Sequence, residues 1–352
     1  MKRGLLLLTT AALALALSGC GGKPAPETEP SPPPEAPLAW ETLTVELSKE
    51  GQATQDLLSA VRELPAPLAA ALANHGVTVE RVEITVGSSH AATVQALEEG
   101  GVDLAFLPAE ALAEGETAPQ ALLVSGPTFR DQGERAEDWN REPADTPAVP
   151  GSRTLLCAAP TEYGKNLAGR RDWSWEELSR ARWGVLEGDS LPGYRAVNLY
   201  LADHYEGDTL ADLPDVTAYA DLSSLLGAAA NGEIDLLAMD DAGRSDWAEA
   251  WTLAKTERDS RGEAGLGRSG AIWEELPVLA LTERFYSGAA AVRPDSESLA
   301  SERFAAALAA AVEDLTRDNA VGALAKEVLG AEPYIPAPGG ALDPLRRLLT
   351  ME

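Results

Sequence analysis

The chain has 352 residues, of which 45% are hydrophobic and 24% are charged. This length and composition allow a sizeable core, predict two domains and exclude an intrinsically disordered protein. The formal net charge of −28 excludes a nucleic-acid-binding protein and disfavours contact with anionic lipid headgroups. An anionic ligand would need local hydrogen-bond donors to overcome this field.

The N-terminus has the pattern of an export signal. Lys2 and Arg3 precede an apolar run from Leu5 to Leu17, and the small residues Ser18 and Gly19 follow it. The run is too short to remain as a membrane-spanning helix. We therefore expect residues 1–19 to be a signal peptide.

The tetrad Leu17-Ser18-Gly19-Cys20 resembles the lipobox of bacterial lipoproteins. The resemblance implies that the Cys20 sulfur receives a diacylglyceryl group and that the protein is held at the outer face of the bacterial cell membrane. The alternative is an ordinary signal peptide followed by a free cysteine. The second cysteine, Cys157, lies in an apolar run and is expected to be a buried hydrophobic residue.

Residues 20–39 are rich in proline, glycine and glutamate, which predicts an extended tether. From about Trp40, strands and helices alternate. The first series comprises strands at 42–47, 78–86 and 102–107, with helices at 54–73 and 91–99. We expect Pro65 and Pro67 to break or kink the first of these helices.

A second series repeats this alternation. It comprises strands at 154–160, 182–187, 215–220 and 234–239, with helices at 175–180 and 194–205 and a further helix that runs through Ala230. Residues 255–270 form a charged, glycine-rich loop, and a late strand at 289–294 precedes a helix at 302–318. Alternating strands and helices favour mostly parallel sheets covered on both faces.

One phrase occurs twice, as EEGGVDLAFL at 98–107 and as ANGEIDLLAM at 230–239. In each copy a glycine (Gly100 or Gly232) ends a helix, and an aspartate (Asp103 or Asp235) precedes an apolar strand. One copy would indicate no more than a helix, a turn and a strand. Two copies at equivalent points predict an α/β protein of two similar lobes, each a mixed, mostly parallel sheet flanked by helices. In such folds a ligand binds in a cleft between the lobes, which close about hinge crossovers.

The order and spacing of four segments resemble the solute-binding proteins of ABC importers, in the branch that binds phosphonates and phosphate esters. The segments are 92–112, 173–201, 219–241 and 276–294. The resemblance implies a type II periplasmic-binding-protein fold, with lobe I at 40–155 plus 280–352 and lobe II at 156–279. It places the two crossing strands near 154–160 and 277–284.

The resemblance also implies ligand contacts at several second-lobe positions. A serine-rich turn of the family corresponds to residues 189–193 here, which keep Ser190 and Gly193. The tyrosine before a later helix is kept as Tyr219, whereas the family histidine that opens this helix is replaced near Asp221. A family tyrosine in the first lobe appears as Leu112. The scaffold is thus supported more strongly than phosphonate as the ligand.

In the first lobe, Ser88, Ser89 and His90 follow a strand and open a helix. Hydroxyls, free backbone N–H groups and the helix dipole would meet there, which suits an anionic oxygen. The alternative is that one serine caps the helix.

In the second lobe, Ser190 and the backbone of Gly193 and Tyr194 are the facing candidates, beside Asp189. Asp189 would disfavour an anion unless the ligand also carries a positive group. Asp240 and Asp241 end the second copy of the repeated phrase and could hold an amine, although solvated carboxylates are common in a chain this acidic.

The sequence therefore predicts an extracytoplasmic receptor that captures a small oxyanion-bearing solute of the phosphonate or phosphate-ester class, including aminoalkyl members. We expect a monomer whose partners are the solute, an ABC permease and, through the lipid, the membrane. The alternatives are a receptor for an amine, a betaine or a thiamine precursor, and a sensor subunit. An extracytoplasmic hydrolase is disfavoured because the chain lacks a Gly-x-Ser-x-Gly or His-Glu-x-x-His motif. We expect no catalytic residue, cofactor or metal.

Overall fold

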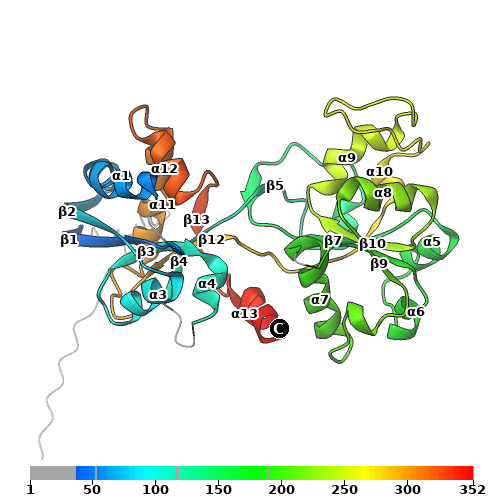
Figure 1. The fold of residues 1–352 in the computed structure, drawn as a ribbon, viewed down its shortest axis with the longest axis horizontal. Coiled ribbons are helices and arrows are strands. Elements are labelled where there is room, and N and C mark those ends of the chain that lie inside the picture. Colours follow the sequence, from blue (N-terminus) through cyan, green and yellow to red (C-terminus); the bar gives the residue numbers. More distant parts are fainter. Residues whose placement is uncertain (1–36, 52–53, 116–118, 189, 352) are drawn as a thin grey trace, which may run out of the picture. The chain divides into compact units, whose positions relative to one another are not determined.

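The computed structural model describes residues 37–51, 54–115, 119–188 and 190–351. Residues 37–352 form one compact unit (Figure 1). The predicted signal peptide, Cys20 and residues 20–36 of the predicted tether lie outside the described residues, so these assignments stay predictions. The first strand begins at Leu38, two residues before the predicted start of the folded part at Trp40.

The first sheet has six strands within the described ranges, in the order β13-β4-β12-β3-β1-β2. Strands β1, β2 and β3 are parallel, and β12 runs antiparallel to both β3 and β4. The late strand β12 thus returns the chain to the sheet with which it began. The bounds are β1 Leu38–Leu47, β2 Val77–Val86, β3 Leu104–Pro108, β4 Gln120–Ser125, β12 Gly288–Val292 and β13 Tyr334–Pro336.

Helices cover both faces of this sheet, and together they form what we call the first lobe. One face packs against α1 Gln55–Glu63, α2 Pro65–Asn74, α11 Glu302–Arg317 and α12 Gly322–Leu329. The other face packs against α3 His90–Glu98, α4 Ala109–Ala113 and α13 Asp343–Met351. The predicted break at the proline pair is confirmed, because α1 ends before Pro65 and α2 begins with it.

The second sheet has the order β11-β7-β10-β8-β9 in the described part of the chain. It matches the order β4-β12-β3-β1-β2 of the first sheet, since β8, β9 and β10 are parallel and β7 runs antiparallel to β10 and β11. The bounds are β7 Thr154–Ala158, β8 Trp183–Leu186, β9 Val216–Tyr219, β10 Leu236–Asp240 and β11 Val278–Leu281.

Helices also cover both faces of the second sheet, which with them forms the second lobe. One face carries α8 Leu222–Asn231, α9 Gly243–Thr252, α10 Ile272–Glu275 and the 3-10 turn Ala136–Trp139. The other carries α5 Glu162–Ala168, α6 Trp175–Ser179, α7 Ala196–His204 and the 3-10 turn Leu210–Asp212. The predicted fold class, two similar lobes of mixed sheets flanked by helices, is confirmed.

The repeated phrase has the same structural role in both lobes. Gly100 and Gly232 adopt φ of 72° and 76°, the left-handed conformation that ends a helix. The Asp103 N–H donates to the Thr44 carbonyl at 3.1 Å, and the Asp235 N–H donates to the Arg182 carbonyl at 2.7 Å. Each phrase therefore leads from a helix into a strand, as predicted, and these strands pair in parallel with β1 and β8, respectively.

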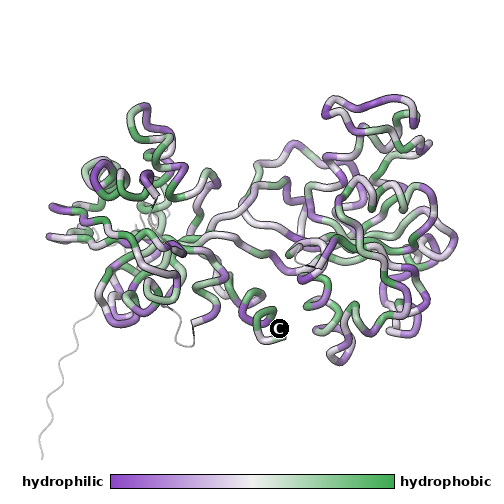
Figure 2. The backbone as a smooth tube through the Cα atoms, viewed as in Figure 1, coloured by the Kyte–Doolittle hydropathy of each residue, from purple (hydrophilic) through white to green (hydrophobic). Residues whose placement is uncertain are grey.

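The central strands are apolar throughout because both of their faces are covered. In β3, Leu104 and Phe106 face one helical layer, and Ala105 and Leu107 face the other. Figure 2 shows the apolar character of these strands along the backbone. This is the pattern expected for strands buried on both sides. In the second sheet, Cys157 of β7 is fully buried, as predicted, and burial raises the pKa of its thiol to about 11.

Residues 126–153 and 282–287 link the two sheets. The first link includes the antiparallel strands β5 Thr128–Arg130 and β6 Ala148–Pro150. The strands predicted to cross between lobes, β7 and β11, instead pair with each other inside the second sheet. The predicted limits of lobe II, 156 and 279, lie two residues inside the ends of that sheet and stay a prediction.

Candidate functional site

The predicted first-lobe site is a capped helix start. The Ser89 hydroxyl accepts a hydrogen bond from the Ala92 N–H at 3.1 Å, so Ser89 is the N-cap of α3. The His90 Nδ1 lies 2.6 Å from the Ser48 hydroxyl, and Ser88 is exposed.

Carboxylates of the chain itself contact this helix start. The His90 N–H donates to Glu50 Oε1 at 2.9 Å, and the Thr93 hydroxyl donates to Glu46 Oε1 at 2.7 Å. An incoming anion would have to displace Glu50 and approach Glu46. Ser88, Ser89 and His90 therefore stay a prediction, and the geometry favours the capping alternative for Ser89.

The predicted second-lobe turn opens a short π-helix, Leu191–Arg195. The Ser190 hydroxyl accepts from the Gly193 N–H at 3.1 Å and so caps this helix. A Cβ on Gly193 would lie 2.5 Å from the Leu186 side chain, which explains the glycine by packing. The Tyr194 N–H donates to the Ser190 carbonyl at 2.9 Å, and Asp189 lies outside the described residues. These assignments also stay predictions.

The next two candidates lie at the start of α8. Tyr219 is half-buried at the end of β9, and burial raises the pKa of its hydroxyl. The Asp221 carboxylate caps α8 by accepting from the Ser224 N–H at 2.7 Å, which lowers its pKa. Asp221 thus acts as a helix cap where the resemblance expects a ligand-binding histidine.

Asp240 and Asp241 lie where β10 meets the link between the sheets. Asp241 Oδ2 accepts from the Arg153 N–H at 2.9 Å, and the Asp241 N–H donates to the Arg153 carbonyl at 3.1 Å. Burial raises the pKa of Asp241 to about 7, with repulsion from Asp240 adding to the effect, and burial also raises the pKa of Asp240. The pair therefore makes stability depend on pH.

We expect Asp241→Asn to weaken this pH dependence. The folded protein binds a proton at Asp241 between about pH 4 and pH 7, where the unfolded chain does not, so this group lowers stability as the pH rises through that window. At about pH 8 the variant should melt roughly 3–5 °C above the wild type, since 1 kcal/mol is worth about 2–4 °C at this size. Thermal unfolding at about pH 5 and pH 8 measures the effect, with Asp145→Asn as control because the Asp145 side chain is 95% exposed. Equal pH dependence in wild type and Asp241→Asn would refute the prediction.

A cavity of about 770 Å³ lies beside the link and is lined by none of the predicted site residues. Its lining comes from α7, from the end of β11 with the second linking segment, from residues 338–347 at and before the start of α13, and from two residues of the first linking segment. The polar and aromatic members are Glu134, Arg153, Tyr200, Asp203, His204, Thr282, Glu283, Arg284, Phe285, Tyr286 and Arg347. Its size lies within the range typical of sites for small molecules.

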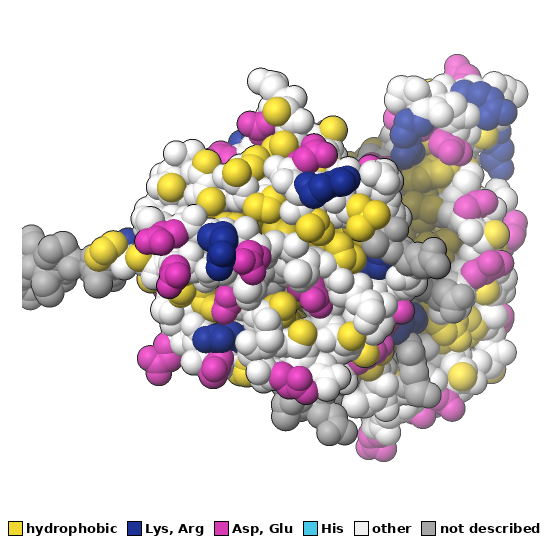
Figure 3. Space-filling view, turned by 60° about the vertical axis from the view of Figure 1, so that its left-hand side comes forward, with side chains coloured by type: hydrophobic (Ala, Val, Ile, Leu, Met, Phe, Trp, Pro, Cys, Tyr) yellow, Lys and Arg dark blue, Asp and Glu magenta, His cyan; other side chains and the backbone are white. Residues whose placement is uncertain are grey.

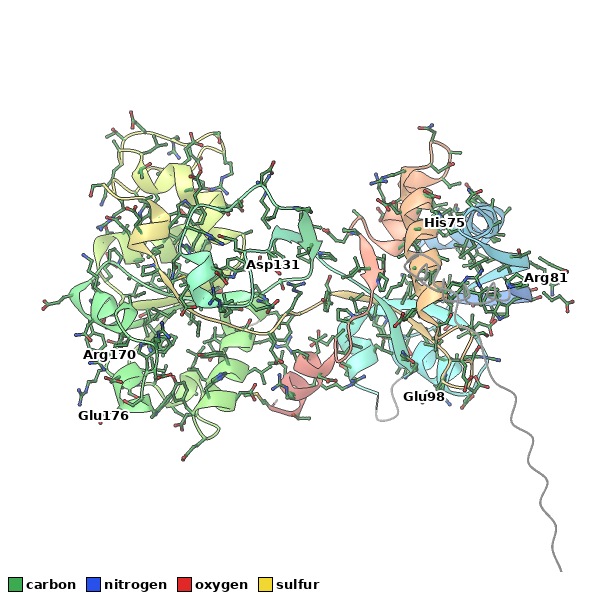
Figure 4. The ribbon with its side chains drawn as sticks, turned by 180° about the vertical axis from the view of Figure 1, so that it is seen from behind. His75, Arg81, Glu98, Asp131, Arg170 and Glu176 are labelled. Atoms are coloured by element: carbon green, nitrogen blue, oxygen red, sulfur yellow. The ribbon has the colours of Figure 1, made fainter. Side chains whose placement is uncertain are left out.

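Ion pairs tie the walls of this cavity together. Arg347 of α13 lies 2.8 Å from Asp203 of α7 and also contacts Glu283. Arg153 pairs with Glu134, and Arg284 pairs with Asp131, which Figure 4 labels in the linking segment. Acidic side chains are scattered over the face drawn in Figure 3, in keeping with the net charge of −28. Each of the three arginines of the cavity pairs with at least one carboxylate.

The sequence did not identify the residues of this cavity. Arg153 and Arg284 flank the two strands that carry the chain into and out of the second sheet, in the segments SRTLLC and LTERF. Had the antiparallel pairing of β7 with β11 been recognised, the two arginines would have been expected on neighbouring segments.

No helix in the described part of the chain combines the length and the hydrophobicity needed to cross a bilayer. No group of three or more His, Cys, Asp or Glu side chains arranged to hold a metal ion occurs among the described residues.

No protein-family model matches the chain, and no curated protein matches it. Several solved structures are similar in fold. A Xanthomonas citri protein solved with ATP is 13% identical with a TM-score of 0.39, over 89% of this chain and 98% of that chain. PhnD1 of Prochlorococcus marinus, solved with methylphosphonate, is 13% identical with a TM-score of 0.34, and the match covers 89% of this chain and 99% of that chain. The binding protein component of a Pseudomonas aeruginosa ABC phosphonate transporter is 14% identical with a TM-score of 0.33, and the match covers 88% of this chain and 85% of that chain. Values this low carry no conclusion about what this chain binds.

Proposed function

We propose that this protein is an extracytoplasmic solute-binding receptor of an ABC import system. It captures a small oxyanion-bearing solute of the phosphonate or phosphate-ester class, including aminoalkyl members, and delivers it to a membrane permease. The observation that carries the proposal is the pair of sheets with the same strand order, joined by residues 126–153 and 282–287 beside a 770 Å³ cavity. A hinge of this kind allows two lobes to close on a ligand.

The cavity supports binding better than bond cleavage. Its arginines pair with carboxylates, and such charged groups suit the recognition of a polar solute. Capture by closure of the lobes needs no reacting group. Turnover of an ester or a glycoside by the pure protein would overturn the assignment as a receptor. The lipobox-like tetrad supports anchoring through Cys20 at the outer face of the membrane, next to the permease partner.

An amine-bearing solute is the second candidate. The cavity carries three carboxylates, Glu134, Asp203 and Glu283, and the Arg347 guanidinium already lies between the last two. A ligand ammonium could take the place of this guanidinium. Betaines, amines and thiamine precursors therefore belong in the same test as the phosphorus compounds.

Thermal unfolding with added solutes tests the proposal. Residues 37–352 contain the whole described core, so this fragment is suitable. The panel comprises phosphate, phosphite, alkyl and aminoalkyl phosphonates, sulfonates, betaines, amino acids and thiamine precursors. A solute at about a thousand times its dissociation constant should stabilise by roughly 4 kcal/mol, which raises the melting temperature by several degrees. A rise in melting temperature with an oxyanion supports the proposal. A rise with amines alone supports the second candidate. No change in melting temperature with any solute counts against both.

A further inference from the structure

Arg153 and Arg284 differ in their burial from Arg347, the third arginine that lines the cavity. The Arg153 side chain is 8% exposed and the Arg284 side chain 20% exposed, whereas that of Arg347 is 43% exposed. Both residues line the cavity. Each leaves its Nε without a hydrogen-bond partner, although these atoms are covered. Burying a guanidinium is costly unless its N–H groups are paired, so the groups of the chain itself do not fully satisfy either side chain.

Arg153 is buried, whereas its acidic partner Glu134 is largely exposed. The Glu134 side chain is 73% exposed, so water competes for its carboxylate and its contact with Arg153 is worth little. The remaining contact of the Arg153 guanidinium is a long hydrogen bond of 3.4 Å to the Gly133 carbonyl. An anion that replaces Glu134 therefore sacrifices little stabilisation.

The Arg284 side chain is held in place by Phe129 and Asp131. Its guanidinium carbon lies 5.2 Å from the centre of the Phe129 ring, and it pairs with Asp131, whose side chain is 21% exposed. Stacking on an aromatic ring fixes the guanidinium plane before a ligand arrives. Arg284 is thus oriented in advance of binding.

The two arginines come from linking segments that lie side by side. The Thr154 N–H donates to the Thr282 hydroxyl at 2.9 Å, and the Thr282 N–H donates to the Thr154 carbonyl at 3.0 Å. Arg153 directly precedes Thr154, and Arg284 follows Thr282 by two residues. A ligand that touches both arginines would therefore contact both links between the sheets.

We infer that Arg153 and Arg284 bind the anionic group of the captured solute, with Glu134 and Asp131 occupying that position until the solute arrives. This inference rests on the proposed function and specifies its ligand. Two guanidinium groups favour an oxyanion with at least two oxygens, such as a phosphonate, a phosphate ester or a carboxylate. The same site explains how a chain of net charge −28 can hold an anion.

Two variants of residues 37–352 test the inference by calorimetric titration with phosphate, methylphosphonate and 2-aminoethylphosphonate. Glu134→Gln removes the competing carboxylate and should tighten anion binding by about fivefold, the effect of one charge close by in water. Its matched control is Glu176→Gln, because the Glu176 side chain is 77% exposed and also pairs with an arginine. Arg284→Gln should weaken binding by about 10- to 100-fold, the usual loss for a hydrogen bond to a charged group. Its control is Arg268→Gln, whose side chain is 26% exposed and pairs with Glu275 away from the cavity.

The outcomes separate this inference from the proposed function. Tighter binding in Glu134→Gln, with the wild-type constant in Glu176→Gln, supports the inference even if Arg284→Gln does not fold. An anion that binds all four variants and the wild type equally leaves the receptor assignment standing and overturns the site. If none of the three anions binds the wild type, the anion site is overturned as well, and the amine candidate of the proposed function is then the one to examine.

Discussion

Replacing Gly151 by alanine is expected to destabilise the protein by about 2–4 kcal/mol and to displace Arg284. Gly151 has a φ of 112°, which alanine adopts with strain. A Cβ there would lie 2.8 Å from Arg284 Cγ and 3.1 Å from the Phe285 carbonyl oxygen. The two linking segments therefore come too close at this point for any side chain. Thermal unfolding measures the loss, and the same variant should bind the solute more weakly.

Gly207→Ala is the matched control for this strain. Gly207 has a φ of 96° with nothing within 4 Å of the added Cβ, so it tests the backbone conformation without the clash. We expect about 1 kcal/mol of destabilisation there. If Gly151→Ala cost no more than Gly207→Ala, the close approach of the linking segments would be wrong.

Removing the Asp235 carboxylate should cost about 2–3 kcal/mol, or roughly 5–10 °C in melting temperature. Asp235 is 4% exposed and accepts two hydrogen bonds from the Arg182 guanidinium, at 2.8 and 2.9 Å, and one from the Thr161 hydroxyl at 2.7 Å. In Asp235→Ala these donors lose their acceptor at the point where β10 begins.

The exposed Asp246→Ala serves as control for this loss. The Asp246 side chain is 58% exposed and lies 3.7 Å from Arg261, so its removal should change the melting temperature by less than about 2 °C. Comparable losses in the two variants would contradict the account of Asp235. The hydrogen bonds of Arg182 and Thr161 lower the pKa of Asp235 although burial alone would raise it, so the stability that Asp235 contributes is lost only as the pH falls through this lowered pKa.

The duplicated architecture could be predicted because it depends on local signals. The glycine that ends a helix, the following aspartate and the apolar run occur together in both copies of the repeated phrase. These signals need few contacts from distant segments, and Gly100 and Gly232 accordingly have the expected positive φ. Pro65 gave an equally local signal, which separates α1 from α2.

The cavity could not be predicted because its lining depends on long-range packing. Arg153 and Arg284 are brought together by the antiparallel pairing of β7 with β11, and Arg347 reaches the cavity through the packing of α13. No periodicity within residues 126–153 indicated that part of this segment packs on the second lobe. A sequence pattern reports local structure, whereas this cavity arises from four separate segments.

The predicted binding serines illustrate the same limit. Ser89 and Ser190 each follow the end of a strand and precede a helix, a position that suits both an anion site and an N-cap. Both accept a hydrogen bond from the helix that they precede. Asp221 does the same for α8. The residue type alone could not separate the two roles, because both use the same oxygen atom.

Small-angle scattering of residues 37–352, with and without each solute of the panel, tests capture by two lobes most directly. The account predicts that the radius of gyration decreases when a solute saturates the site, because closure about residues 126–153 and 282–287 brings the sheets together. Identical scattering with every solute that calorimetry shows to bind would contradict it.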